Sequence, residues 1–423
     1  MQDVDLLKAV CIKDFDHFTD FGFFPPDAYK IKGNDFGLLN ALGDEWRTLK
    51  ANITPAFSLR NIKNIAININ PVALDVVDYL KKHANKPVNM NKLSGFYAMD
   101  CIGKIAYSVD FKCVQNEGNE ISEKCEGMIE AWRFIFTSMF PKLAYWFNIP
   151  IYKGDSMHYI VNFSKNIMRQ REGMANPPQD VLGLMMKVRD NELKANEKDT
   201  EVYGLKAATK NLMTDDMIAS TLMQFFLDGN DTVEAALGMT WYFLATHPEV
   251  QEKAIEEVDR VYEACDGVLT GDFVNELKYL DCCFSEAGRL GPFPTTMRTC
   301  TKDWTIPGTS VTIPKGMRVM VPILGVQMDP DNFPEPDKYD PERFAGENKH
   351  GMKSGSYLQF GMGPRQCIGM KIARIEAKVV MFQVLRHFRL ETCEKTPVPL
   401  QWSSTEFNKV EGGCWVRPVA RQH

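Results

Sequence analysis

The amino-acid sequence predicts a mainly α-helical protein of the α+β class, in which a bundle of helices carries small β-sheets. In the first half of the chain, apolar residues recur at helical spacing in most segments. One uninterrupted helix is expected from Asp215 to about Thr246, and at 1.5 Å per residue it would be roughly 45 Å long. After about residue 290 the pattern changes to short alternating segments that are typical of small sheets.

The elements follow one another in a simple order. The helices predicted ahead of the long one are Val4–Val10, Asp44–Phe57, Ile62–Ala84, Asn91–Ser108, Ser122–Met139, Tyr159–Glu172 and Val181–Val188. The polar stretch Arg189–Lys210 predicts a solvated loop. Thr214 caps the long helix, which ends before Pro248. After a helix at Leu277–Leu290, the predicted strands are Trp304–Ile306, Val311–Ile313 and Arg318–Pro322. A final helix and a strand-rich tail complete one predicted domain over residues 1–423.

Composition narrows the class of protein. A chain of 423 residues with 44% hydrophobic content can bury a large core. Its net charge of −6 argues against nucleic acid as a partner. Eleven cysteines, an odd number without a pattern, indicate a reducing compartment rather than a disulfide framework. No apolar run reaches the roughly 18 residues of a membrane span, and the acidic opening Met1–Asp5 is unlike a signal peptide.

The most informative motif surrounds one cysteine. Phe360, Gly363, Arg365, Cys367 and Gly369 are spaced as a protein needs them to hold a thiolate against a haem iron. The two glycines would let backbone N–H groups crowd the sulfur. An apolar-periodic stretch follows, so the sulfur is expected at a helix N-terminus, where the dipole lowers the pKa of the thiol. Phe360 can shield the sulfur from water, and Arg365 can reach an anionic haem propionate.

Other interpretations of Cys367 are weaker. Most lone cysteines are small buried hydrophobic residues. A zinc site would need a second Cys or His at ligand spacing, and none is present there. A nucleophilic cysteine would need a histidine base, and none of the seven histidines can be paired with it from the sequence. A lone thiolate with an arginine and a hydrophobic shield therefore predicts a haem-thiolate site.

With this motif the chain resembles the cytochrome P-450 family, whose haem-binding signature is Phe-x-x-Gly-x-Arg-x-Cys-x-Gly. The family's other landmarks follow in order over nearly the whole chain. The resemblance implies the family fold, with haem b between the long helix and the loop that carries Cys367. Segments Glu45–Ser58, Leu277–Asp281 and Thr301–Pro314 resemble the animal microsomal branch that oxidises lipophilic foreign compounds and steroids.

The long helix contains Asp228-Gly229-Asn230-Asp231-Thr232. Glycine costs about 1 kcal/mol in a helix interior, and beside a back-bonding threonine it can open a bulge that holds water. In the family, the matching element delivers protons to oxygen bound at iron, which would place Thr232 at the oxygen and Asp231 in the proton relay. Alone, the element would favour a back-bonded Thr and a solvated Asp, and its position upstream of the cysteine motif, in the family's order, favours the role in proton delivery. Asp228 departs from the family's usual Ala or Gly.

A charge cluster matches the family's architectural residues. Glu286 and Arg289 are three positions apart on a predicted helix and face the same way. They match the family's Glu-x-x-Arg, and its Pro-x-Arg-Phe supplies Arg343. One carboxylate with two guanidiniums can form a buried network that fixes the Cys367 loop. Between Glu286 and Arg289, Gly288 stands where a bulkier helix former is usual.

Further cations are expected to hold the haem. Trp46 and Lys50 match a family element that grips a propionate, and Arg298 is the expected second clamp. The alternative for each cation is a solvated surface charge. A basic surface that could dock an acidic electron donor is predicted from Lys349, Lys353, Lys371 and Arg374.

The resemblance implies a monooxygenase that inserts one atom of O₂ into a lipophilic organic substrate. The implied electron donor is NADPH-cytochrome P-450 reductase, and the implied location is the cytosolic face of the endoplasmic reticulum membrane. Compared with the family's microsomal members, the chain is expected to lack the N-terminal anchor, the first helix and the first strands. Membrane association is expected for the full-length form. The alternatives are a haem-thiolate isomerase or dehydratase, against which Asp231 and Thr232 argue, and a truncated non-catalytic haem-binding product.

Overall fold

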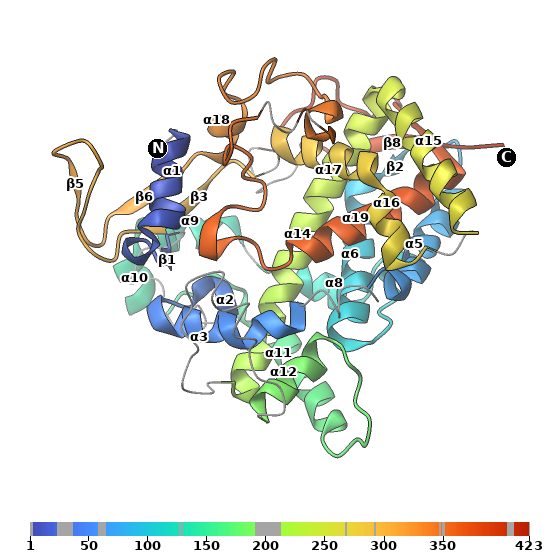
Figure 1. Cartoon of the computed structure of the whole chain (residues 1–423). Coiled ribbons are helices and arrows are strands. Elements are labelled where there is room, and N and C mark those ends of the chain that lie inside the picture. Colours follow the sequence, from blue (N-terminus) through green and yellow to red (C-terminus); the bar gives the residue numbers. More distant parts are fainter. Residues whose placement is uncertain are drawn as a thin grey trace.

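The structure is a computed structural model that describes residues 3–422 apart from 23–36, 58–64, 127, 129, 191–212, 267–268, 292, 347, 349–351 and 404–409. Helices dominate it, and the sheets are small and antiparallel (Figure 1). The predicted mainly α fold with small sheets is confirmed.

The helices and strands have the following bounds. The helices are α1 Val4–Lys8, α2 Gly37–Asn40, α3 Gly43–Ile53, α5 Ile65–Lys82, α6 Met90–Tyr107, α7 Cys113–Asn116, α8 Glu120–Cys125, α9 Ala131–Met139, α10 Pro141–Trp146, α11 Gly154–Arg171, α12 Val181–Arg189, α14 Asp215–Thr246, α15 Pro248–Ala264, α16 Gly271–Glu276, α17 Lys278–Leu290, α18 Ile323–Gln327 and α19 Met370–His387. A π-helical turn, Ala9–Lys13, continues α1, and 3₁₀ turns lie at Phe15–His17, Thr54–Phe57, Pro341–Phe344 and Gly363–Arg365. The strands are β1 Asp20–Phe21, β2 Val88–Asn89, β3 Thr296–Thr299, β4 Trp304–Thr305, β5 Thr312–Ile313, β6 Arg318–Val321, β7 Phe388–Glu391 and β8 Trp415–Ala420.

The long helix α14 has the predicted bounds, Asp215–Thr246, because its ends carry strong signals. The Thr214 side chain accepts a hydrogen bond from the Met217 N–H, and Pro248 opens the next helix. Figure 1 shows α14 running through the middle of the molecule, with α19 beside it. It packs chiefly against α6, α11 and α17, while α19 packs against α5, α15 and α17.

Helix α14 belongs to two separate apolar clusters. Its residues from Ile218 to Leu227 pack with α3, α6, α11 and α12. Its residues from Val233 to Ala245 pack with α5, α6, α15, α17 and α19. The polar segment Asp228–Thr232 lies between the two clusters and belongs to neither. The polar segment is therefore the one stretch of α14's middle that the described core leaves accessible.

Two three-stranded sheets position the remaining parts. One has the order β1-β3-β6, with Phe21 opposite Arg298 and Arg298 opposite Val319. The other has the order β2-β8-β7 and joins the tail to the start of α6. Strands β4 and β5 form a separate ribbon. The first sheet brings the N-terminal segment beside Arg298.

Three parts of the chain differ from the sequence-based expectations or lie outside the described residues. The single helix predicted at Ser122–Met139 is wrong: α8 and α9 are separate, because the Met128 carbonyl accepts a hydrogen bond from Lys153 N–H (2.8 Å) instead of continuing a helix. Helix α15 was not predicted, although Pro248 and the buried series Val250, Ala254, Ile255, Val258 and Val261 mark it. The predicted loop Arg189–Lys210 lies mostly outside the described residues.

Candidate haem site

The Cys367 loop, residues 360–369, leads directly into α19. The N–H groups of Gly369 and Met370 donate hydrogen bonds to the Cys367 sulfur, and the Cys367 N–H donates to the Phe360 carbonyl (2.9 Å). The sulfur therefore lies at the N-terminus of an 18-residue helix, as the motif predicts. All eleven cysteines are free.

The Cys367 thiol does not have the lowered pKa that its helix position suggests. Although the Cys367 side chain is exposed on one side, desolvation by the surrounding protein is the largest influence and raises its pKa to about 11, with a further increase from the Asp228 charge. The hydrogen bonds from Gly369 and Met370 and the charge of Lys50 act in the opposite direction but are weaker. The expectation of a lowered pKa is wrong for the protein alone, because desolvation of the sulfur exceeds the effect of the helix terminus. A metal cation would have to supply the missing stabilisation of the thiolate.

Of the two glycines in the motif, Gly363 serves a different purpose from the one expected. Gly363 has φ +72°, and a Cβ there would lie 2.0 Å from the Cys11 carbonyl oxygen. A Cβ on Gly369 would lie 3.9 Å from the sulfur, which is an ordinary contact. Gly363 is therefore required because the N-terminal segment packs against the loop, not because the sulfur needs space.

Three predicted cations from distant parts of the chain lie within electrostatic range of one another, and one of them, Lys50, also acts on the Cys367 sulfur. Lys50, on α3, is buried and its ammonium donates to the Pro364 carbonyl. Burial, Arg365 and Arg298 lower the pKa of Lys50 to about 8, while Cys367 acts to raise it. Such mutual repulsion shows that Lys50, Arg298 and Arg365 share one neighbourhood.

Trp46 organises two of these cations. Its buried ring lies 4.1 Å from the Arg365 guanidinium carbon and 5.5 Å from the Lys50 nitrogen. Arg365 also donates to the carbonyls of Thr19 (2.8 Å), Leu38 (3.2 Å) and Ala41 (2.8 Å). Arg365 thus ties the Cys367 loop to the segment that leads into α3.

Arg298 is the clearest sign that an anion belongs here. Its side chain is 2% exposed, and no ion pair is present for it among the described residues. Its guanidinium lies over Phe21 and donates to Met297 O (2.9 Å) and Thr296 Oγ1 (3.4 Å), while its Nε has no hydrogen-bond partner. Desolvation lowers the pKa of Arg298. Because a buried cation needs a counter-charge, the carboxylates of a haem fit this donor set.

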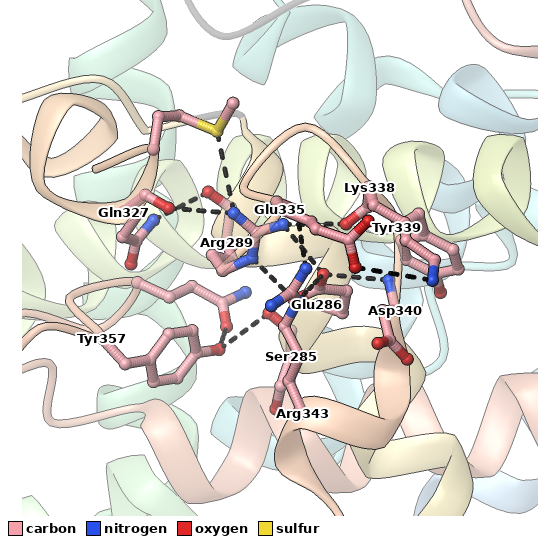
Figure 2. A network of polar contacts seen from close by, with 12 residues as sticks. Ser285, Glu286, Arg289, Gln327, Glu335, Lys338, Tyr339, Asp340, Arg343 and Tyr357 are labelled. Carbon is pink, nitrogen blue, oxygen red and sulfur yellow. Dashed lines mark hydrogen bonds and ion pairs between the residues drawn. The ribbon is translucent and has the colours of Figure 1, made fainter. Parts of the chain in front are cut away.

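Figure 2 shows a network of polar contacts around Glu286 and Arg289. The Glu286 side chain has no exposed surface. Arg289 Nε and Nη2 donate to the two Glu286 oxygens (2.7 and 2.8 Å), which is a bidentate pair. Arg343 Nε and the Asp340 N–H donate to Glu286 Oε1 (3.2 and 3.0 Å). Burial raises the pKa of Glu286, and these donors oppose that effect. One carboxylate thus holds two arginines, as the sequence suggests.

The network reaches the Cys367 loop through backbone contacts. Gln327 Nε2 donates to the Arg289 carbonyl (2.9 Å), while its Oε1 accepts from Leu358 N–H (2.7 Å). The Tyr357 hydroxyl donates to the Ser285 carbonyl (3.2 Å). Residues 357 and 358 immediately precede the loop, so the network fixes where the loop begins.

Gly288 has a packing reason that the sequence does not reveal. A Cβ at this position would lie 2.0 Å from the Gln359 Nε2. The absence of a side chain lets the buried Gln359 lie against α17. The glycine therefore brings the loop close to the helix that carries Glu286 and Arg289.

The polar segment Asp228–Thr232 lies in the middle of α14, and one of its residues, Asp228, is within electrostatic range of the Cys367 sulfur. The Thr232 hydroxyl donates to the Asp228 carbonyl, and the helix remains α-helical without the expected bulge. Asn230 Nδ2 donates to Asp231 (3.2 Å). The side chains of Asp228, Asp231 and Thr232 are exposed, although residues before and after them on α14 are buried.

Asp228 is the residue of this segment that acts electrostatically on Cys367. Although it is exposed on its open side, the surrounding protein desolvates it, and together with Asp231 this raises the pKa of Asp228 to about 7. A hydrogen bond from Gln224 opposes that increase. Carboxylate and thiol therefore lie on facing elements, α14 and the Cys367 loop.

The sequence profile of the family described as cytochrome P450, written P-450 here, matches residues 1–410. The chain belongs to the cytochrome P-450 family. It is 30% identical to cytochrome P-450 9e2 of Blattella germanica over 98% of this chain and 82% of that protein. It is also 30% identical to cytochrome P-450 3A41 of Mus musculus (99% and 82%) and 32% identical to cytochrome P-450 3A2 of Rattus norvegicus (95% and 79%).

Membership confirms the family and the animal microsomal branch that the motifs indicate. The protein is a haem-thiolate monooxygenase with haem b as its cofactor. As in the family generally, it uses O₂, an organic substrate and a redox partner.

Proposed function

We propose that Cys367 is the axial thiolate of a monooxygenase that acts on lipophilic organic substrates with electrons from NADPH. The carrying observation is the sulfur of Cys367, which receives two backbone N–H groups at the start of α19 amid three converging cations. When bound there, the haem iron supplies the activation of O₂ by which one oxygen atom enters the substrate and the other leaves as water.

The other site residues take separate roles. Lys50, Arg298 and Arg365 bind the propionates, and the Trp46 ring keeps two of these cations in place. The Thr232 hydroxyl and the Asp231 carboxylate hold and move protons on the exposed part of α14, on the other side of the haem from the sulfur. Glu286, Arg289 and Arg343 fix the loop and take no part in the chemistry.

The carbon monoxide difference spectrum of the reduced protein tests the ligand. Wild-type protein should show the red-shifted Soret band of a thiolate-ligated haem, and Cys367→Ser should lose it. Retention of that band in Cys367→Ser would contradict the assignment. NADPH consumption with reductase and a lipophilic substrate then separates a monooxygenase from an isomerase or dehydratase, which would consume none.

We propose the NADPH-dependent flavoprotein reductase as the electron donor. Lys353 and Lys371 are exposed on either side of the loop and can attract an acidic surface. Arg374 contributes less, because it is paired with Asp281 (2.6 Å), and Lys349 lies outside the described residues. Lys371→Glu should slow reductase-supported turnover without changing the carbon monoxide spectrum. Equal slowing with a small-molecule reductant would point to a damaged site instead.

We also propose that the protein lies against the endoplasmic reticulum membrane. Within the described part of the chain, no helix is long and apolar enough to cross a bilayer. Helices α9 and α10 nevertheless expose a concentrated set of large apolar side chains: Trp132, Ile135, Met139, Phe140, Leu143, Tyr145, Trp146 and Phe147. Trp146 is 82% exposed, and such a patch is typical of a surface that contacts lipid.

Flotation with phosphatidylcholine vesicles tests this surface. The double variant Trp146→Ser/Phe147→Ser should reduce vesicle binding while the carbon monoxide spectrum stays intact. A matched control, Met317→Ser/Met320→Ser, removes two half-exposed apolar side chains from the β6 region and should leave binding unchanged. Equal losses in both variants would overturn the assignment of α9 and α10 to the membrane.

A further inference from the structure

Asp228 is a carboxylate in the middle of α14, the long helix of the proposed site. It lies between the two apolar clusters and one helical turn before Thr232, so both side chains are on the same face of the helix. The Asp228 side chain is exposed on this face, and its charge lies within electrostatic range of the Cys367 sulfur. A substrate held between α14 and the sulfur must therefore lie beside this carboxylate.

The orientation of Asp228 is fixed by its neighbour Gln224. The buried Gln224 uses its Oε1 to accept a hydrogen bond from Leu39 N–H (3.0 Å), so its amide oxygen is directed at α2. Its amide nitrogen remains for Asp228, to which it is hydrogen-bonded. The carboxylate is thus held in place by a residue that is itself anchored to another element.

Asp228 has no positive partner among the residues that the structure describes. The charged group that acts on it is Asp231, which has the same sign. Two buried carboxylates of the described interior do have counter-charges: Glu286 has two arginines, and Asp180 is paired with Arg171 (2.6 Å). A desolvated carboxylate without a counter-ion is costly, and a bound cation would relieve that cost.

We propose that Asp228 is a specificity-determining residue that selects lipophilic substrates carrying an ammonium group. The inference rests on the proposed function, because it places the substrate between α14 and the Cys367 loop. The ammonium group would pair with the Asp228 carboxylate about one helical turn, or about 6 Å along the helix axis, from Thr232. The apolar remainder of the substrate would lie against the adjoining side chains of α14.

Binding of a matched pair of ligands to the haem-loaded protein tests this assignment. The probes are 4-phenylbutyl-trimethylammonium, whose quaternary nitrogen cannot ligate iron, and its neutral carbon isostere (5,5-dimethylhexyl)benzene. Equilibrium dialysis measures Kd for both probes in wild type, Asp228→Asn and Asp228→Ser. We expect both variants to lose about tenfold in affinity for the ammonium probe and to bind the isostere as before, because only the charge pair is removed.

A charge-matched control separates a local pair from a general effect of net charge. Asp216→Asn removes one carboxylate from the exposed start of α14 and should change neither Kd. An unchanged ammonium affinity in both Asp228 variants would overturn the inference, as would an equal loss in Asp216→Asn. If wild type bound the isostere but showed no thiolate band with carbon monoxide, the proposed function would fail, and this inference with it. A normal band without discrimination between the probes would overturn only the inference.

Discussion

Glu286 and Asp228 are carboxylates on two helices near the Cys367 loop, and their surroundings differ sharply. Glu286 is completely buried, yet two arginines and a backbone N–H satisfy its oxygens. Asp228 is exposed, has Gln224 as the one hydrogen-bond partner of its side chain among the described residues, and lies within electrostatic range of Asp231 and a thiol. The paired carboxylate holds the architecture in place. The unpaired one leaves its charge available to a ligand.

The largest expected effect follows from removing the charge of Glu286, the carboxylate that pairs with Arg289 and Arg343. Glu286→Gln leaves Arg289, which has no exposed surface, without its counter-charge and should cost about 3–5 kcal/mol of stability. The denaturation midpoint and the yield of the thiolate Soret band should both fall. Glu335→Gln is the control in the same region, because its ion pair with Lys338 is long (4.0 Å) and exposed. Comparable losses in both variants would contradict the distinction.

A third carboxylate, Glu376 on α19, extends the comparison to the dependence of stability on pH. It is 5% exposed, and desolvation raises its pKa from 4.5 to about 8. Because the native state retains a proton that the unfolded state releases, this group lowers stability as pH rises from 4.5 to 8. Glu376→Gln should therefore stabilise the protein by a few kcal/mol at pH above about 8, with little effect near pH 4.5.

Unfolding midpoints at several pH values measure this window. Glu263→Gln, at an exposed position of α15, should show no such dependence. A gain for Glu376→Gln that did not grow with pH would show that another property of the side chain is responsible.

The next effect concerns the contact between Gly288, on the helix that carries Glu286, and Gln359, just before the Cys367 loop. Gly288→Ala adds a Cβ that meets Gln359 at 2.0 Å and should destabilise by about 1–3 kcal/mol, despite the better helix propensity of alanine. Adding Gln359→Ala removes the clash, so the double variant should recover stability relative to Gly288→Ala. Chemical denaturation of both variants measures the recovery. Without any recovery, Gln359 would not be the source of the clash.

The smallest expected effect on stability comes from a change at Asp228. Asp228→Asn keeps the shape of the side chain and removes a charge that lies near Asp231 and Cys367. Because the group is exposed on one side, the stability change at pH 8 should be a gain below about 1 kcal/mol. The same chemical change, carboxylate to amide, should thus act in opposite directions at positions 228 and 286. Thermal unfolding of the two variants in one buffer checks the sign.

Local patterns explain why much of the site could be predicted. The Phe360–Gly369 motif, the Thr214 cap and the Glu286–Arg289 spacing each depend on residues close in the sequence, and they placed Cys367 before α19 and defined α14. The break after α8 could not be found in this way. It depends on a hydrogen bond between Met128 and Lys153, on separate segments.

The sequence by itself determined the family, the helical class and the place of Cys367 at the start of α19, because each is encoded in a short run of residue types. Only the tertiary structure decided how these groups act on one another. It brings Lys50, Arg298 and Arg365 together, raises the Cys367 pKa instead of lowering it, and gives Asp228 no counter-charge among the residues it describes. Desolvation and Coulomb interactions depend on distances between segments hundreds of residues apart, and no local pattern specifies those distances.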